Sequence, residues 1–208
     1  MPRRAQQAPD GRLSRAMRSR LAICEACLDL IEEGVLQPSA DQVADRADLS
    51  RRSIFYHFSD LAELYDAVVD EGMRRCGPLL KGIPRELPVG DRVTMLSEGR
   101  ARFLEATTPF RRALAAQSLV GAARQQAVRV ARNLLQVQRD EIAGLFAREI
   151  ENLSARDRSE LCEALSAAAS PATWEHLRFS RGLSMPRARA VVERSLTSLL
   201  RDAGVDLP

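Results

Sequence analysis

Aromatic residues make up only 4% of this 208-residue chain. The low aromatic content, with many Ala, Leu, Arg and Glu residues, favours helices, because strands are enriched in aromatic and β-branched residues. With 45% hydrophobic residues the chain is still able to bury a sizeable core, as one large domain or two small ones. The composition therefore predicts an all-α protein.

Long apolar runs are also missing. No run approaches the roughly 20 residues that a membrane-spanning helix needs. The start of the chain is rich in arginine and lacks the apolar stretch of a secretory signal peptide. We therefore expect a cytoplasmic protein without a membrane partner.

Cysteine is scarce, and its spacing gives little sign of chemistry. Cys24 and Cys27 form a C-x-x-C pair inside a helical pattern, and no second pair follows at zinc-finger spacing. We interpret them, with Cys76 and Cys162, as small buried side chains, the alternative being a redox or metal-binding role. The sequence also lacks a nucleophile motif and a glycine-rich phosphate loop. We expect no enzymatic activity, no cofactor and no metal site.

Positive charge is concentrated at the start of the chain. The formal net charge is only +3, yet the first twenty residues have a single acidic residue, Asp10, among many arginines. A basic segment suits a polyanion, above all nucleic acid, and the alternative is a solvated tail. We predict a flexible basic arm at residues 1–17. The arginines among the first twenty residues are Arg3, Arg4, Arg12, Arg15, Arg18 and Arg20.

Three helical patterns follow the arm. Apolar residues recur at intervals of three and four up to Ile31, and Gly34 is placed to end this helix. Ser39 is placed to cap a short second helix, and Ser50 a third that contains Ile54. Two short helices joined by a tight turn and packed on a first helix form a helix-turn-helix, whose second short helix enters the DNA major groove.

The later part of the chain contains further helix signals. Thr108-Pro109 has the form of a cap followed by a proline at the first helical position, and it predicts a new helix from Phe110 to about Leu119. Gly121 permits a turn before a long run of helical periodicity. Further starts are indicated by the capping-box spacings Asp60/Glu63 and Ser154/Asp157, and by Ser184-Met185-Pro186.

The stretch from Arg20 to Leu64 contains a series of motifs in order: Gly34, Val43-Ala44, Ala47-Asp48-Leu49-Ser50 and Ser53-Ile54-Phe55-Tyr56-His57-Phe58. With these motifs at this spacing, the stretch resembles the TetR family of transcriptional regulators. A weaker similarity covers Trp174-Glu175-His176-Leu177-Arg178, Gly182-Leu183-Ser184 and Val191-Val192. The resemblance implies a helix-turn-helix DNA-binding domain at residues 18–60 and an effector-binding and dimerisation domain at residues 61–208. About nine helices are expected in all.

Two positions depart from the family pattern. Asp48 stands where the family usually has Gly in the turn, and Asp tolerates left-handed backbone geometry better than most residues, at some cost. Leu61 stands where many members have a Lys that reaches a DNA phosphate. The resemblance therefore implies one missing phosphate contact, for which Arg15 and Arg18 of the arm are candidate substitutes.

The start of the third helix is where the resemblance places base recognition. Arg51 and Arg52 are the leading candidates, because Arg can donate two hydrogen bonds to guanine O6 and N7. The alternative is that one or both contact only phosphates, and the sequence leaves open which of them faces the bases. Ser50 and Ser53 belong to the same first turn.

Contacts with the DNA backbone are expected one turn later and at the second helix. The resemblance implies that Tyr56 and His57 donate hydrogen bonds to phosphate oxygens, while Phe55 or Phe58 anchors the helix. Ser39 begins the second helix, where the helix dipole favours an anion. A role for Ser39 as a simple N-cap is the alternative, and both roles are compatible.

The resemblance implies a ligand-responsive repressor. Because one helix-turn-helix covers only a few base pairs, we expect it to bind a palindromic operator in double-stranded DNA as a homodimer. The alternatives are an activator of the same fold and a non-specific architectural DNA-binding protein. We expect an interface at Leu161, Leu165, Ala168, Val191, Ser195 and Leu199, some of which could instead be intrachain core. An unidentified small-molecule effector is expected near Arg102, Thr107, Gln117, Trp174 and His176, each of which could instead be structural.

Overall fold

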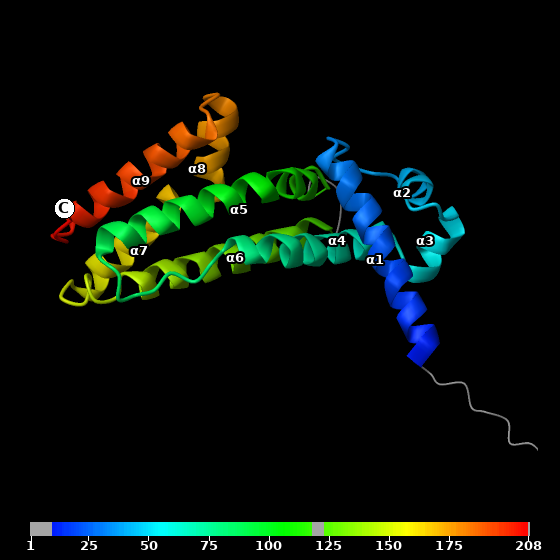
Figure 1. Cartoon of the computed structure of the whole chain (residues 1–208), viewed down its shortest axis with the longest axis horizontal. Coiled ribbons are helices and arrows are strands. Elements are labelled where there is room, and N and C mark those ends of the chain that lie inside the picture. The colour runs from blue at the N-terminus through cyan, green and yellow to red at the C-terminus, as the bar shows by residue number, and fades with distance from the viewer. Residues whose placement is uncertain (1–9, 118–122, 208) are drawn as a thin grey trace, which may run out of the picture. The chain divides into compact units, whose positions relative to one another are not determined.

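The computed structural model of the chain describes the backbone of residues 10–117 and 123–207, and the side chains of residues 15–116 and 132–207. These residues form the α-helices α1 to α9 and contain no strand, which confirms the predicted all-α class (Figure 1). The chain divides into two compact units. The first is Met1–Arg75 with Pro109–Leu119, and the second is Cys76–Thr108 with Val120–Pro208.

The first unit begins with a helix that is longer than the sequence pattern predicts. Helix α1 covers Asp10–Glu32, so residues 10–17 are helical rather than part of a flexible arm. The extension has a physical reason, since Asp10 is favourable at a helix N-terminus and the following Arg, Leu, Ala and Met residues are good helix formers. The rest of the predicted arm, including Arg3 and Arg4, lies outside the described residues.

The ends of the next helices are fixed by the predicted capping residues. Gly34 has a φ of +97° and ends α1, with its N–H donating to the carbonyl of Ile31. Helix α2 (Ala40–Arg46) starts at a capping box, in which Ser39 Oγ accepts from the Gln42 N–H at 3.2 Å and the Gln42 side chain accepts from the Ser39 N–H. Helix α3 (Arg51–His57) starts at Ser50, whose Oγ accepts from the Ser53 N–H at 3.1 Å.

Helix α4 (Leu61–Cys76) packs with the first three helices up to Arg75. Its Leu64 and Val68 belong to the same buried cluster as Ile54 of α3 and Leu28 of α1. The predicted domain boundary after residue 60 therefore differs from the division of the structure. The difference arises because the apolar face of α4 is buried against the helix-turn-helix.

The cysteines are buried, as predicted. Cys24 and Cys27 lie in the core of the first unit, and Cys76 and Cys162 are buried as well. Burial raises the pKa of Cys24 to about 11 and that of Cys27 to about 12, so both thiols stay protonated at neutral pH.

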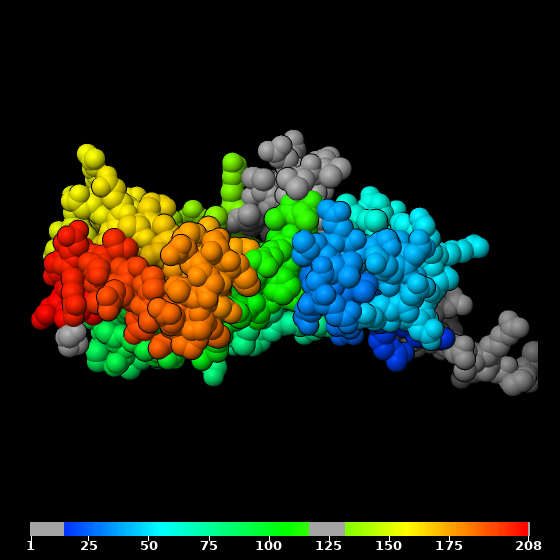
Figure 2. All heavy atoms as spheres, turned by 90° about the horizontal axis from the view of Figure 1, so that it is seen from above, coloured from blue at the N-terminus to red at the C-terminus, as the bar shows by residue number. Residues whose placement is uncertain are grey.

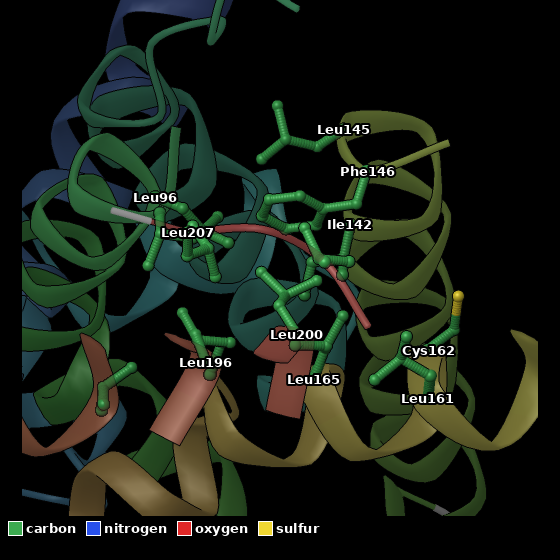
Figure 3. Packing of buried hydrophobic residues seen from close by; sticks show 14 of the residues in the cluster. Leu96, Ile142, Leu145, Phe146, Leu161, Cys162, Leu165, Leu196, Leu200 and Leu207 are labelled. Carbon is green, nitrogen blue, oxygen red and sulfur yellow. The ribbon is translucent and has the colours of Figure 1, made fainter. Parts of the chain in front are cut away.

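The second unit surrounds a separate apolar core. It contains the 3₁₀ turn η1 (Gly77–Leu79), the first part of α5 (Val89–Gln117), α6 (Ala123–Leu145), α7 (Ala155–Ala168), α8 (Pro171–Glu175), the π-helical turn η2 (His176–Ser180) and α9 (Met185–Asp202). Leu165 of α7 and Leu196 and Leu200 of α9 point into the same interior as Ile142 and Phe146 (Figure 3). Nothing in the described part of the chain is both long and apolar enough to cross a membrane.

The predicted helix start at Thr108-Pro109 is wrong. Helix α5 continues without a break through Pro109 to Gln117. The hydroxyl of Thr108 donates to the carbonyl of Leu104 at 2.6 Å, and that of Thr107 to Phe103 at 2.8 Å, so neither residue caps a new helix. Hydroxyls bound within a helix in this way are compatible with its continuation, although proline removes one backbone hydrogen bond. The turn expected at Gly121 lies outside the described residues.

The turn between α2 and α3 requires a left-handed residue at Asp48, whose φ is +54°. Only glycine adopts this conformation without a steric cost, and Asp is more tolerant than Ala. We expect Asp48→Gly to be more stable than Asp48→Ala by about 1 kcal/mol. The urea midpoint followed by circular dichroism measures the difference, and equal midpoints for the two variants would contradict it.

Candidate nucleic-acid interface

The exposed face of α3 is formed by polar and aromatic side chains. Ile54 is fully buried, whereas Tyr56 is 83% exposed and Phe55 is 41% exposed. Phe58, the residue after the helix, is only 1% exposed. Of the two phenylalanines considered as anchors, Phe58 therefore holds the helix in the core and Phe55 does not.

Arg51 and Arg52 have different surroundings. Arg51 Nη1 donates to Asp41 Oδ2 of α2 at 2.9 Å, and its guanidinium lies 5.7 Å from the centroid of the Phe55 ring. Arg52 is exposed in the same first turn, and no hydrogen bond or ion pair joins it to another described side chain. The Arg51 side chain is thus oriented by Asp41, while the donors of Arg52 face solvent.

The predicted phosphate-contacting residues occupy accessible positions. Tyr56 is exposed and His57 is half-buried, with their rings in an edge-to-face contact at 5.2 Å. Ser39 and Ser50 are exposed, and each hydroxyl already accepts a backbone N–H as an N-cap. Ser53 is half-buried and its hydroxyl lies 2.9 Å from that of Ser50.

Leu61 and the arginines of α1 differ in their exposure and in their contacts. Leu61 is partly buried and packs against the core of the first unit, so this position serves packing instead of supplying a charge. Arg15 and Arg18 are exposed on α1. Arg20, which the sequence grouped with the basic arm, is bound within the protein.

Arg20 of α1 contacts both the end of α3 and the first turn of α4. Its Nη1 donates to the backbone carbonyl of His57, and its Nη2 donates to Glu63 Oε1 of α4 at 2.9 Å. Its guanidinium lies 4.1 Å from the centroid of the Phe58 ring. Sequence reasoning missed this role. The available signal was the position of Arg20 one turn before Ile23 and Cys24, where it extends the apolar stripe of α1.

Glu63 only partly matches the capping box predicted at the start of α4. Asp60 Oδ1 accepts from the Glu63 N–H at 2.9 Å, as expected. A complete capping box would have the Glu63 carboxylate accept the N–H of Asp60. Instead the carboxylate accepts the N–H of Ser59 at 2.7 Å and is paired with Arg20. The Ser59 amide and the Arg20 guanidinium lower the pKa of Glu63 to about 2.

The predicted effector residues differ in their burial. Arg102 and His176 are exposed, Thr107 is buried, and the side chain of Gln117 lies outside the described residues. Trp174 is 1% exposed, and its Nε1 donates to Glu105 Oε2 at 3.0 Å. An open surface hollow of about 530 Å³ in the second unit is lined by other residues, including Arg85, Arg148, Glu149 and Asp206. Within residues 15–116 and 132–207 no cluster of His, Cys, Asp or Glu is arranged to hold a metal ion.

The predicted interface residues on α7 and α9 separate by burial. Leu161 and Leu165 lie in the chain's own core. Ala168, Ser195 and Leu199 are partly buried, and Val191 is 41% exposed. Helix α9 lies at the surface of the second unit, where it is red in Figure 2.

Comparisons with known proteins identify the fold. No family model matches the sequence, and no match is found among curated proteins. A TetR-family transcriptional regulator from Streptomyces coelicolor superposes with a TM-score of 0.66 at 16% identity, over 92% of this chain and 90% of that one. A transcriptional regulator from Rhodococcus sp. Rha1 gives a TM-score of 0.66 at 14% identity, over 93% of this chain and 98% of that one. The chain has the fold of these regulators.

The lowered pKa of Glu63 has a consequence for stability. Its value of about 2 in the folded protein lies below the ordinary 4.5, so ionised Glu63 stabilises the fold above pH 4.5. That contribution is lost as the pH falls toward 2. We expect the urea midpoints of the wild type and Glu63→Gln to converge between neutral pH and about pH 3. A difference that stays constant over this range would contradict the expectation.

Proposed function

We propose that the protein is a sequence-specific DNA-binding transcriptional regulator that reads the major groove with α3. The observation that carries the proposal is Arg52, whose exposed guanidinium stands in the first turn of a helix anchored on its other side by Ile54 and Phe58. The first turn of a recognition helix is the part that reaches base edges, and arginine is the commonest reader of guanine. The fold shared with two regulators supports this reading.

The surrounding residues have distinct proposed roles. Arg51 is oriented by Asp41 and contacts a base or a phosphate beside Arg52. Tyr56, His57, Ser39, Ser50 and Ser53 supply backbone contacts, which position the helix without reading sequence. Arg15 and Arg18 of α1 add salt-dependent affinity in place of the cation missing at Leu61.

Selection of bound DNA from a random pool tests the proposal. A regulator of this kind selects a discrete inverted repeat, whereas an architectural binder selects none. With the selected DNA, we expect Arg52→Ala to weaken binding at least about tenfold and to relax the preference at one base pair in each half-site. Arg156→Ala on α7 removes an exposed arginine of the second unit and serves as the matched control. Equal losses in the two variants would contradict base reading by Arg52.

We further propose that the protein acts as a homodimer. One helix-turn-helix covers only a few base pairs, so two copies related by a two-fold axis are needed for a selective site. The exposed Val191 and the partly buried Ala168, Ser195 and Leu199 supply small and apolar contact groups on α7 and α9. Leu161 and Leu165 support these helices from the core behind.

A negative charge introduced on the proposed α7 and α9 interface tests the homodimer. We expect Val191→Glu to shift the protein toward monomer in sedimentation experiments, because the interface would bury an unpaired carboxylate. Binding to the inverted repeat should weaken by about tenfold or more as a result. Val137→Glu is the matched control, since Val137 is 66% exposed and lies on α6. Dissociation in both variants, or in neither, would count against the proposed interface.

The second unit is the proposed sensor. We propose that a small molecule bound there changes DNA affinity by favouring one of two states of the dimer, which makes the protein a ligand-responsive repressor acting in the cytoplasm. Thr107 and Trp174 are buried polar groups in its helices, while Arg102 and His176 are accessible. Displacement of the selected DNA by a metabolite library tests this step, and the absence of any compound that changes DNA affinity would contradict it.

A further inference from the structure

The joint between α3 and α4 is held by contacts that converge on a side chain of α1. Between the last residue of α3 and the first of α4 lie only Phe58, Ser59 and Asp60. Arg20 contacts the backbone carbonyl of His57 and the Phe58 ring on one side of this joint. On the other side it pairs with Glu63, which also accepts the Ser59 N–H at 2.7 Å.

We propose that Arg20 is a positioning residue for DNA reading, which fixes the C-terminal end of α3 against α1 and α4 without contacting DNA itself. The proposal rests on the proposed function, because it assigns α3 to the major groove. It removes Arg20 from the group of basic residues that attract phosphate, to which Arg15 and Arg18 still belong.

A short recognition helix needs such a restraint. Helix α3 has seven residues, too few to be stable alone, and Ile54 is its buried residue. A helix C-terminus carries partial negative charge on its unpaired carbonyls, so a guanidinium there is favourable. Arg20 supplies that cation and, through the Phe58 ring, also contacts the residue that anchors the helix in the core.

Arg20 is also a poor candidate for a phosphate contact. Its side chain is 41% exposed, yet Nη1 and Nη2 both donate within the protein. Lysine has a single ammonium group and cannot reproduce the planar fork that reaches a carbonyl and a carboxylate together. Arg20→Lys therefore changes the geometry of the side chain and keeps its positive charge.

Glu63 gives a test whose sign distinguishes the two roles. Glu63→Gln removes a negative charge from the DNA-binding unit, so electrostatics alone predicts tighter DNA binding. Loss of the pair with Arg20 instead predicts weaker binding, because the end of α3 is released. We expect Glu63→Gln, Arg20→Lys and the double variant to bind the selected DNA about fivefold to tenfold more weakly than the wild type, with losses that are not additive.

The salt dependence of binding is measured on the same variants. Since Arg20 neutralises no phosphate in this proposal, the slope of affinity against salt concentration should remain that of the wild type in Arg20→Lys and Arg20→Gln. Arg75→Gln is the matched control. Arg75 Nη2 pairs with Glu25 Oε1 at 3.2 Å and so joins α4 to α1, but this pair does not belong to the joint between α3 and α4. It should leave DNA affinity within about twofold of the wild type.

Hydrogen exchange in the free protein gives a measurement that does not depend on DNA. The Phe58 N–H donates to the Ile54 carbonyl at 2.9 Å and reports on the end of α3. We expect it to exchange faster in Arg20→Lys and Glu63→Gln, and unchanged in Arg75→Gln.

The outcomes separate the two proposals. Unchanged exchange in Arg20→Lys, tighter DNA binding by Glu63→Gln, or a reduced salt slope in Arg20→Gln would each overturn the positioning role. Failure of the wild type to select a discrete DNA site, with faster exchange in Arg20→Lys, would overturn the proposed function and leave Arg20 as a structural restraint of α3.

Discussion

The apolar stripe of α1 is the constraint on which the first unit depends. Helices α2 and α3 have seven residues each, and neither is long enough to be stable by itself. Their buried residues, such as Val43 and Ile54, share one core with Ile23 and Cys27 of α1 and with residues of α4. The exposed face of α3 is therefore supported by packing on the opposite side of the helix.

Local chemistry is what the sequence predicts well. Ser39, Ser50 and Gly34 end or begin helices where the pattern placed them, because capping depends on residues a few positions apart. The left-handed turn at Asp48 follows from the same local logic. Pro109 is the exception. Its local signal matches a helix start, yet the threonine hydroxyls before it are bound inside a continuing helix.

Contacts between distant residues are what the sequence could not supply. The pairs Arg20–Glu63 and Arg51–Asp41 join different helices, and arginines at other positions of the same helices look equivalent by charge alone. The surroundings of the predicted effector and interface residues also depend on contacts with distant helices. The indole N–H of Trp174 donates to Glu105, a partner from another helix that the local sequence does not indicate. Burial of Leu161 and Leu165 likewise depends on which helix covers α7.

The pair between Arg51 and Asp41 affects how the protein would discriminate among DNA sequences. Under the proposed function, a DNA contact that uses the Nη1 donor of Arg51 would replace its existing carboxylate partner, so the free energy gained would be a difference between two acceptors. A single phosphate offers little advantage over Asp41, whereas paired acceptors on one base match the guanidinium fork better. Asp41 would thus compete with poorly matched DNA for that donor, and it would raise selectivity by weakening the wrong complexes.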